Sequence, residues 1–527
     1  MNRRNFLRSS AAATVGGLAV RGFSSPLLRA LQNNTIADDR ALVIVQLFGG
    51  NDGLNTVIPL DSYDLLSQLR PQVLIPESEV LSLTGLGATG LHPSMGGFRD
   101  LWDDGKLAIV QGVSYPDPNQ SHFRATDIYE TGSDAGVILN SGWTGRYLIG
   151  EYPNYPAGYP NTNMPDPLAI RVGGSMGPGL QNLGVSMGVS INNTDDALSL
   201  VGNRYTDPVP ATCVGGKLAN VRTVQRQTDL YGDVIEAAAL AGCNQSTMYP
   251  TGSQPGASLA RALKIVAQLI CGGLKTKIYW VSLGGFDTHA EQVVATDHTT
   301  GTHANLLQGL SDSIRAFQDD LQLLGLEDRV LGMTFSEFGR RIVSNASLGT
   351  DHGTAQPMFL FGSNVIPGML GTNPDIPANT TTNTNMAMQY DYRSVYASVL
   401  KDWFCLNTEQ LDDVLLETFQ ALNLVDPGGC LGTSLHEANQ QAGEDLLSAY
   451  PNPFVERTTL RFTSFGGPLL LQLFNEQGQL VRTILNRTLP AGSHTAHADL
   501  GDLQTGVYYV RMQNGGRQQV RNLLKVR

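Results

Sequence analysis

The chain has 527 residues and a formal net charge of −12, which argues against nucleic acid as a partner because that function needs a concentrated positive surface. Charged residues make up only 16% of the sequence and apolar residues 41%, whereas glycine (58) and proline (26) are plentiful. This composition is typical of a loop-rich exported protein with at least one large core, and not of a helical bundle.

The first 32 residues have the pattern of an export signal. Arg3 and Arg4 are followed by Asn-Phe-Leu-Arg and then by a mildly apolar run over 11–20. This segment resembles a twin-arginine signal peptide, which implies recognition by the twin-arginine export machinery. An amphipathic N-terminal helix is the alternative. No other segment reaches the roughly 18 apolar residues of a membrane helix, so we expect no transmembrane helix in the mature protein.

The body of the chain, over 40–427, alternates between strand and helix patterns. Near-continuous apolar runs, typical of strands buried on both faces of a sheet, cover 41–48, 107–113, 276–283, 330–335 and 358–361. Helical patterns lie between them, notably over 258–271 and 305–324. We therefore predict an α/β fold with a mostly parallel central sheet flanked by helices.

Acidic residues and histidines follow or precede several of these strands in glycine-flanked loops. Separate strands can bring carboxylates and imidazoles to one sheet edge, where both groups are suitable ligands for a cation. The candidate metal ligands are Asp52, Asp287, His289, Glu337, Asp351 and His352. A further segment with Ser121, His122 and Arg124 opens a predicted helix that runs toward residue 131.

Each of these segments also has a purely structural interpretation. Asn-Asp-Gly around Asp52 is a common turn signal, Asp287 could cap a helix, and Ser121 could be the N-cap of its own helix. The distribution of histidines favours a functional interpretation. Three of the nine histidines fall within these segments, namely His122, His289 and His352.

Taken together, the motifs resemble one family over 42–424. They read Phe-Gly-Gly-Asn-Asp-Gly-Leu-Asn-Thr, Ser-His-Phe, Gly-Gly-Phe-Asp-Thr-His, Ser-Glu-Phe-Gly-Arg-Arg and Gly-Thr-Asp-His-Gly. This set, in this order, is similar to the domain-of-unknown-function family numbered 1501, which is grouped with the alkaline phosphatases and sulfatases. The resemblance implies an alkaline phosphatase-like central sheet with a metal site at its edge.

The resemblance also implies roles for individual residues. Asp52 matches the metal carboxylate that follows the first strand, and Ser121 matches the nucleophile at a helix N-terminus. Asp287 and His289 fall where a carboxylate and an imidazole of one metal are expected. His352 matches the late histidine that precedes the last core strand.

The chain departs from the superfamily pattern in two places. Glu337 takes the position of an aspartate that is normally followed by histidine, and here Phe338 follows instead. The interval between Asp287 and His289 is shorter than usual. Asp351 either replaces a missing ligand or orients the neighbouring His352 from outside the site.

The five cysteines are too few and too scattered for a disulfide framework, and none forms the Cys-x-x-Cys pair of a zinc-thiolate site. In an oxidising compartment, Cys213 with Cys243 or Cys405 with Cys430 could close moderate loops, and the sequence leaves the pairing open. We expect Cys271, which ends the apolar run 265–271, to be a buried free thiol.

The C-terminal part, over 449–527, changes character after a linker at 428–448. It opens with Tyr-Pro-Asn-Pro-Phe and continues in short alternating runs separated by turn signals, which predict a small antiparallel β-sandwich. The opening, the Thr-Gly-Val-Tyr-Tyr-Val run and the basic end resemble the C-terminal sorting domain of type IX (Por) secretion. This implies type IX export to the cell surface or medium. A carbohydrate-binding or adhesive sandwich is the alternative.

The leading functional hypothesis is a metal-dependent hydrolase of phosphate or sulfate esters, of small molecules or glycans, outside the cytoplasm. Two divalent ions would polarise the ester and Ser121 would attack, while Arg124, Arg340 or Arg341 would neutralise the developing charge. Zinc is the first expectation for the metal, with magnesium, calcium or manganese as alternatives. The second hypothesis is a non-catalytic secreted or surface binding protein on the same scaffold. Ordinary sulfatase chemistry is disfavoured, because the Cys-x-Pro-x-Arg type of segment is absent.

Overall fold

The computed structural model describes residues 39–193, 212–430, 447–450, 454–475, 480–514 and 517–526. The chain divides into two compact units, the first ending at Cys430 and the second beginning at Leu431. The predicted twin-arginine segment over 1–32 lies outside the described residues, as does most of the predicted linker.

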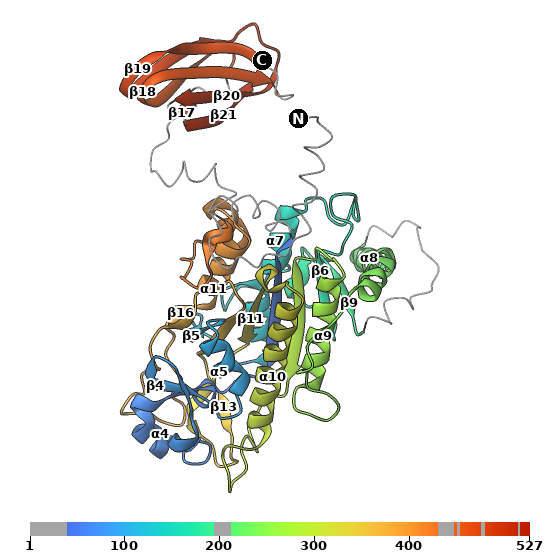
Figure 1. Cartoon of the computed structure of the whole chain (residues 1–527), viewed down its shortest axis with the longest axis vertical. Helices are drawn as coiled ribbons and strands as arrows, with labels where there is room; N and C mark the ends of the chain where they lie inside the picture. Colours follow the sequence, from blue (N-terminus) through green and yellow to red (C-terminus); the bar gives the residue numbers. More distant parts are fainter. Residues whose placement is uncertain are drawn as a thin grey trace, which may run out of the picture. The chain divides into compact units, whose positions relative to one another are not determined.

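A nine-stranded sheet forms the centre of the first unit (Figure 1). Its strands are β1 (Ala41–Phe48), β5 (Leu107–Ser114), β6 (Ala169–Val172), β9 (Val189–Ile191), β10 (Ile278–Gly284), β11 (Val330–Ser336), β14 (Gln356–Phe361), β15 (Gly368–Leu370) and β16 (Tyr390–Asp391). Their order is β15-β5-β14-β11-β1-β10-β6-β9, with β16 beside β5. Only β14 runs antiparallel to its neighbours, and the other pairs are parallel.

Helices cover both faces of this sheet, and successive residues of β1 alternate between two hydrophobic cores. Val43 and Val45 lie in one core, Leu42 and Ile44 in the other, and all four are fully buried. The first core includes side chains of α5 (Gly96–Asp103), α9 (Ala257–Cys271) and α10 (Thr302–Leu323). The second includes α6 (His122–Thr131), α7 (Trp143–Glu151) and α11 (Tyr392–Ser398). Burial on both faces explains the continuous apolar runs and confirms the predicted fold class.

Three neighbouring parallel strands determine where the candidate residues gather. β1 lies between β11 and β10, and Leu47 pairs in register with both Ser336 and Leu283. The carboxyl ends of these strands therefore meet at one edge, where ligand sites of such sheets are found. Beyond β11, the antiparallel pair β12 (Arg340–Ser344) and β13 (Thr350–His352) places Arg340 opposite His352.

The predicted helices over 258–271 and 305–324 correspond closely to α9 and α10. The long α8 (Cys213–Ala241) and a small sheet of β2 (Val57–Pro59), β3 (Leu81–Leu83) and β4 (Leu86–Leu91) were not expected. The remaining described elements are three helices, two short strands, one π-helix and five short 3₁₀ turns. The helices are α3 (Gly53–Thr56), α4 (Tyr63–Leu69) and α12 (Thr408–Leu415), the strands β7 (Gln181–Asn182) and β8 (Val185–Ser186), and the π-helix η8 (Val399–Trp403). The 3₁₀ turns are η3 (Leu60–Ser62), η4 (Glu77–Glu79), η5 (Pro178–Leu180), η7 (Glu327–Arg329) and η9 (Pro427–Gly429). Within the described ranges, no helix combines the length and apolar character needed to cross a bilayer.

The second unit is an antiparallel β-domain, as predicted. Its strands are β17 (Leu447–Tyr450), β18 (Arg457–Asn475), β19 (Leu480–Asp499), β20 (Gly506–Asn514) and β21 (Arg517–Lys525). β19 pairs along nearly all of β18, whereas β17 and β20 pair with opposite ends of it. Gly466 and Gly467 lie between those ends and both adopt positive φ, which lets the long strand change direction. The enclosed core includes Leu460, Leu471 and Val510.

Only one of the two cysteine pairings considered from the sequence forms. Cys405 and Cys430 are joined by a disulfide. Cys213 and Cys243 lie at opposite ends of α8, which at about 1.5 Å per residue separates them too far for a bond. The expectation of a buried Cys271 was wrong, because this residue ends α9 and is partly exposed.

Candidate metal centre

The carboxylate of Asp287, in the loop after β10, is the centre of a cluster of three imidazoles. Its Oδ1 lies 3.2 Å from Nε2 of His289 and 3.2 Å from Nε2 of His352. Its Oδ2 lies 3.5 Å from Nε2 of His122, the first residue of α6. Ligand atoms of His122, Asp287 and His352 all lie within 4.8 Å of one another. These three side chains are close enough to share one ion, and His289 contacts the same carboxylate from outside this group.

The outer nitrogen of each imidazole contacts a separate hydrogen-bond acceptor. Nδ1 of His122 lies 2.7 Å from Glu337 Oε1, and Nδ1 of His289 lies 3.2 Å from Asp351 Oδ1. Nδ1 of His352 lies 2.9 Å from the backbone carbonyl oxygen of Gln120. A carbonyl or carboxylate oxygen can only accept, so each Nδ1 carries the proton and each Nε2 faces Asp287.

This donor and acceptor arrangement tests whether a metal fits. A neutral imidazole that donates from Nδ1 has a lone pair on Nε2, and here that lone pair faces a carboxylate oxygen. Without a cation between them, three adjacent rings would all have to be charged. A cation held by Asp287, His122 and His352 would supply the missing positive charge beside these nitrogens, and the outer acceptors are those typical of metal-bound histidines. The residues present therefore fit a divalent ion.

Charge and burial act differently on the members of the cluster. Partial burial opposes ionisation of Asp287, but the hydrogen bond and charge of Arg340 and the contacts with His352 and His289 lower its pKa to about 2. The hydrogen bond to Glu337 raises the pKa of His122. Burial lowers the pKa of His352, in spite of its contacts with Gln120 and Asp287. The carboxylate is thus ionised, and His352 favours the neutral form that binds metals.

Arg340 is fully buried and holds the loops of the site together. It donates to Asp287 Oδ1 at 2.8 Å and to the carbonyl oxygens of Gly50 at 2.7 Å, Phe286 at 2.9 Å and Thr350 at 2.8 Å. It also donates to the carbonyl oxygen of Gly49. Its predicted part in neutralising substrate charge becomes, in this geometry, a part in positioning Asp287.

Gly49 explains how the loops after β1 and β10 approach so closely. Its φ is +125°, and a Cβ at this position would lie 2.2 Å from the backbone nitrogen of Asp287. Only glycine fits here without displacing the loop that carries the central carboxylate.

Glu337 lies behind the imidazoles and not among them. It is fully buried, and its Oε1 accepts from the backbone N–H of Gly49 at 2.8 Å as well as contacting His122. The geometry makes it an outer partner that orients His122. Phe338, at the position where the resemblance led us to expect a histidine, packs its ring 4.9 Å from that of His122 and 4.6 Å from that of His352, between centroids.

Asp52 belongs to a different cluster of the described residues. It is fully buried, forms an ion pair with Arg70, and accepts a hydrogen bond from Gln292 at 2.6 Å. Burial favours its neutral form, but the charge of Arg70 and the hydrogen bond hold its pKa below the ordinary value. Nearby, His303 contacts Asn51 at 3.0 Å. We name these five residues (Asn51, Asp52, Arg70, Gln292 and His303) the Asp52 cluster.

The remaining predicted residues lie beside the site or away from it. Ser121 is exposed, occupies the N-cap of α6 next to His122, and does not cap the helix with its side chain. Arg124 donates to the carbonyl oxygens of 134, 135 and 137, and Arg341 donates to the carbonyl oxygen of His352 and to Asn383. Asp351 contacts His289 from outside, and not His352, which was the residue we expected it to orient.

His122 is the candidate ligand that the sequence-based set lacked. It was noticed as part of the Ser-His-Phe motif, but the adjacent Ser121 was assigned the functional role there. The sequence signal that could have identified His122 as a ligand was the repeated occurrence of histidine in these motifs. The carbonyl of Gln120 carries no side-chain signal and could not be found from the sequence.

Residues 39–415 match the family described as a protein of unknown function, DUF1501, and the chain therefore belongs to this family. Residues 448–526 match the secretion system C-terminal sorting domain. Both resemblances seen in the motifs are confirmed, and the sorting domain indicates secretion or attachment to the cell surface. No curated protein matches the chain.

Several solved structures are similar to the chain at low identity. One, concerned with glycosaminoglycan metabolism by Bacteroides thetaiotaomicron, is 10% identical, covers 85% of this chain and 89% of its own, and has a TM-score of 0.32. The PsFucS1 sulfatase from Pseudoalteromonas sp. is 10% identical, with coverages of 91% and 88% and a TM-score of 0.26. Alkaline phosphatase from the Antarctic bacterium TAB5 is 8% identical, with coverages of 61% and 91% and a TM-score of 0.23.

Proposed function

We propose that this exported DUF1501 protein binds one divalent cation through His122, Asp287, His289 and His352 and hydrolyses a phosphate or sulfate ester beside it. The observation that carries the proposal is the orientation of the three imidazoles. Each presents Nε2 to Asp287 and has Nδ1 engaged by an outer acceptor. Such an arrangement is typical of histidines that bind a metal.

The ligand chemistry favours zinc among the expected metals. Three imidazole nitrogens and one carboxylate are a common set for zinc, whereas magnesium and calcium prefer sites made of oxygen ligands. The side chains of His289 and Asp287 are 46% and 47% exposed, which leaves room for water or substrate next to the ion. Within the described residues, one group has ligand atoms that are all mutually close, namely His122, Asp287 and His352, and Asp52 is engaged by Arg70, so we propose one ion and not two.

The start of α6 supplies the other groups that an ester substrate needs. A bound divalent ion would polarise the ester and favour ionisation of a nearby hydroxyl or water. The exposed hydroxyl of Ser121 precedes the ligand His122 and is our candidate nucleophile. No side chain caps this helix end, so its first backbone N–H groups and the helix dipole favour an anionic group there.

Metal analysis joined to an ester panel tests this proposal. The full exported protein should contain about one zinc per chain and cleave a phosphomonoester, phosphodiester or sulfate ester. His289→Ala should lose both properties, and Ser121→Ala should keep the metal but lose hydrolysis. His298→Ala is the matched control, because His298 is a partly buried histidine that contacts the carbonyl oxygen of Leu74 instead. Purified protein without metal would contradict the proposed metal site. Full activity of Ser121→Ala would contradict the proposed nucleophile.

A non-catalytic metal-binding surface protein is the second candidate. The buried Arg340 already neutralises Asp287, and in the described part of the chain Arg124 and Arg341 are bonded to backbone and side-chain oxygens of the protein. This arrangement favours holding an ion over stabilising the charge of a transition state. Stoichiometric metal without turnover of any ester in the panel would support it.

Export and domain boundaries complete the proposal. We propose the boundaries 40–427 for the catalytic domain and 449–527 for the sorting domain, with entry into the periplasm directed by residues 1–32.

Replacing Arg3 and Arg4 by lysine should retain the precursor in the cytoplasm, because a receptor reads this signal. Normal export of that variant would contradict the twin-arginine assignment.

A further inference from the structure

Two cysteines of the first unit lie side by side at neighbouring helix ends. Sγ of Cys243, just after α8, is 2.9 Å from Sγ of Cys271, the last residue of α9. This separation is within about 1 Å of the 2.05 Å length of a disulfide bond. The two residues are 28 positions apart in sequence, so the contact is made by the fold and not by adjacency along the chain.

The backbone around both cysteines is held by reciprocal close contacts. A Cβ at Gly242 would lie 2.0 Å from the carbonyl oxygen of Gln268, and one at Gly272 would lie 1.9 Å from that of Ala238. Gln268 also donates from Nε2 to the carbonyl oxygen of Ala239 at 2.7 Å. Because glycines flank the two cysteines and lock the helix ends together, the sulfur atoms are positioned by packed helices.

The compartment of the mature protein favours oxidation of such a pair. The sorting domain indicates secretion or surface attachment, and disulfides form and persist outside the cytoplasm. Cys405 and Cys430 already form a disulfide in this unit. Cys243 is exposed and Cys271 partly exposed, so a disulfide donor can reach them.

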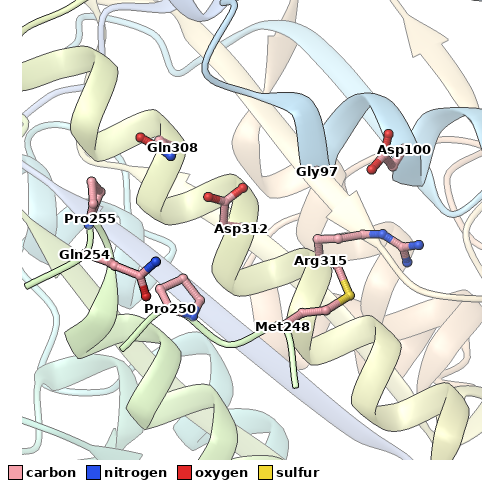
Figure 2. Close-up of a pocket in the computed structure, with 9 residues that line it drawn as sticks. All are labelled: Gly97, Asp100, Met248, Pro250, Gln254, Pro255, Gln308, Asp312 and Arg315. Atoms are coloured by element: carbon pink, nitrogen blue, oxygen red, sulfur yellow. The ribbon is translucent and has the colours of Figure 1, made fainter. Parts of the chain in front are cut away.

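The segment enclosed by the two cysteines forms one wall of a cavity of about 180 Å³ (Figure 2). Opposite walls come from α5 and α10. Close to Cys243, the segment is anchored by the buried Asp320, which accepts hydrogen bonds from four of its groups. These are Nδ2 of Asn244 at 2.7 Å, the backbone N–H groups of Gln245 at 2.6 Å and Ser246 at 3.0 Å, and the hydroxyl of Tyr249 at 3.0 Å. The cavity is lined by Gly97, Asp100, Met248, Pro250, Gln254, Pro255, Gln308, Asp312 and Arg315.

We propose that Cys243 and Cys271 form a second disulfide after export and that this cross-link fixes the cavity wall at 246–256. The thiolate of one cysteine attacks the disulfide of a thiol-disulfide oxidant and releases one oxidant thiol. The second cysteine then attacks the mixed disulfide, forms the Cys243–Cys271 bond and releases the second oxidant thiol. Two electrons and two protons pass to the oxidant.

Thiol labelling before reduction, followed by peptide mapping, tests the bond in full-length protein taken from the surface or extracellular fraction. Cys243 and Cys271 should appear unlabelled in one linked peptide, two hydrogen atoms lighter than the sum of its parts. Protein kept in a reducing cytoplasm is the control and should be labelled at both. Labelled Cys243 and Cys271 in an exported sample whose Cys405–Cys430 peptide is linked would overturn the proposal.

Hydrogen exchange tests the effect on the cavity. Amides of 246–256 should exchange faster in Cys243→Ser/Cys271→Ser than in the wild-type protein, because the enclosed segment loses its covalent cross-link. Amides of β1 are the internal reference and should be unchanged if the variant folds. Equal exchange of 246–256 in the two proteins would overturn the assignment of the bond to the cavity wall, and a variant that fails to fold leaves the peptide mapping to decide.

Discussion

Two aspartates that follow neighbouring parallel strands, Asp52 after β1 and Asp287 after β10, have opposite environments. Asp52 is fully buried and paired with Arg70, whereas the side chain of Asp287 is 47% exposed and faces three imidazoles. Both carboxylates are ionised, since charged or hydrogen-bonded neighbours lower both pKa values. For Asp52, Arg70 supplies a permanent positive charge. At Asp287, the ring nitrogens leave a place for a cation.

The comparison shows that a carboxylate at a strand end becomes a candidate metal ligand or a structural ion pair according to its partners. Arg70 lies 18 residues beyond Asp52 and reaches it from the end of α4. Arg340 also contacts Asp287, but only at one oxygen, and the same guanidinium is shared with four backbone carbonyls. The other oxygen, Oδ2, faces Nε2 of His122 at 3.5 Å.

The largest expected effect is on folding, at the Asp52 cluster. Asp52→Asn leaves Arg70 buried without its countercharge and should lower the free energy of unfolding by about 3–5 kcal/mol. Metal content per folded chain should stay at the wild-type value. Urea unfolding followed by circular dichroism measures the first quantity, and elemental analysis of the folded fraction measures the second. Loss of metal from folded Asp52→Asn would remove the distinction between the two aspartates.

The second effect is a pH dependence of stability that arises beside Asp52. Burial lowers the pKa of His303 to about 4, so the unfolded chain, with a pKa of about 6.5, takes up a proton first as the pH falls. The contribution of neutral His303 to stability is therefore complete above about pH 6.5 and is lost as the pH falls toward about 4, by up to roughly 3 kcal/mol.

Urea titrations at pH 7 and pH 5 measure this dependence. His303→Gln should flatten it, because the amide can still donate to Asn51 but does not titrate in this range. The same slope in the wild-type protein and in His303→Gln would assign the effect to other groups.

The third effect concerns metal affinity at the imidazole cluster. His352→Ala removes one ligand. Loss of an outer partner weakens metal binding by about 10–100-fold, and loss of this ligand should weaken zinc binding by more than that. Stability of the metal-free chain should change little, because this side chain is partly exposed at the sheet edge. Zinc titration by calorimetry gives the affinity, and a metal-free melting curve gives the stability. Unchanged affinity would exclude His352 as a ligand.

The smallest expected effect is on zinc affinity at Glu337, and it distinguishes a metal ligand from an outer partner of a ligand. Glu337→Gln keeps an oxygen that can accept from Gly49 or His122 but removes the charge behind the ring, so zinc affinity should fall by about 10–100-fold. The site should still fill at high zinc concentration. Stoichiometry and affinity from one calorimetric titration decide this, and a complete loss of binding would indicate that Glu337 contacts the ion directly.

Much of this arrangement could be predicted from the sequence, because it depends on strand ends. The runs that become β1, β10 and β11 bury both faces, which predicts a parallel sheet and places Asp287 and His289 at one edge. The sequence does not predict which side chain pairs with each carboxylate. Nothing around Arg70 marks it as the countercharge of Asp52, and a carboxylate such as Glu337 has the same local pattern whether it binds an ion or a histidine.

Arg340 has a further consequence for the kinetics of metal uptake. Its guanidinium joins the loops after β1 and β10 and the strand β13 by hydrogen bonds from within the protein. The backbone of the site is therefore organised before any ion arrives, and binding does not have to restrict mobile loops at the cost of conformational entropy. Uptake should then be fast and limited by dehydration of the ion, and the empty and filled forms should share one backbone conformation.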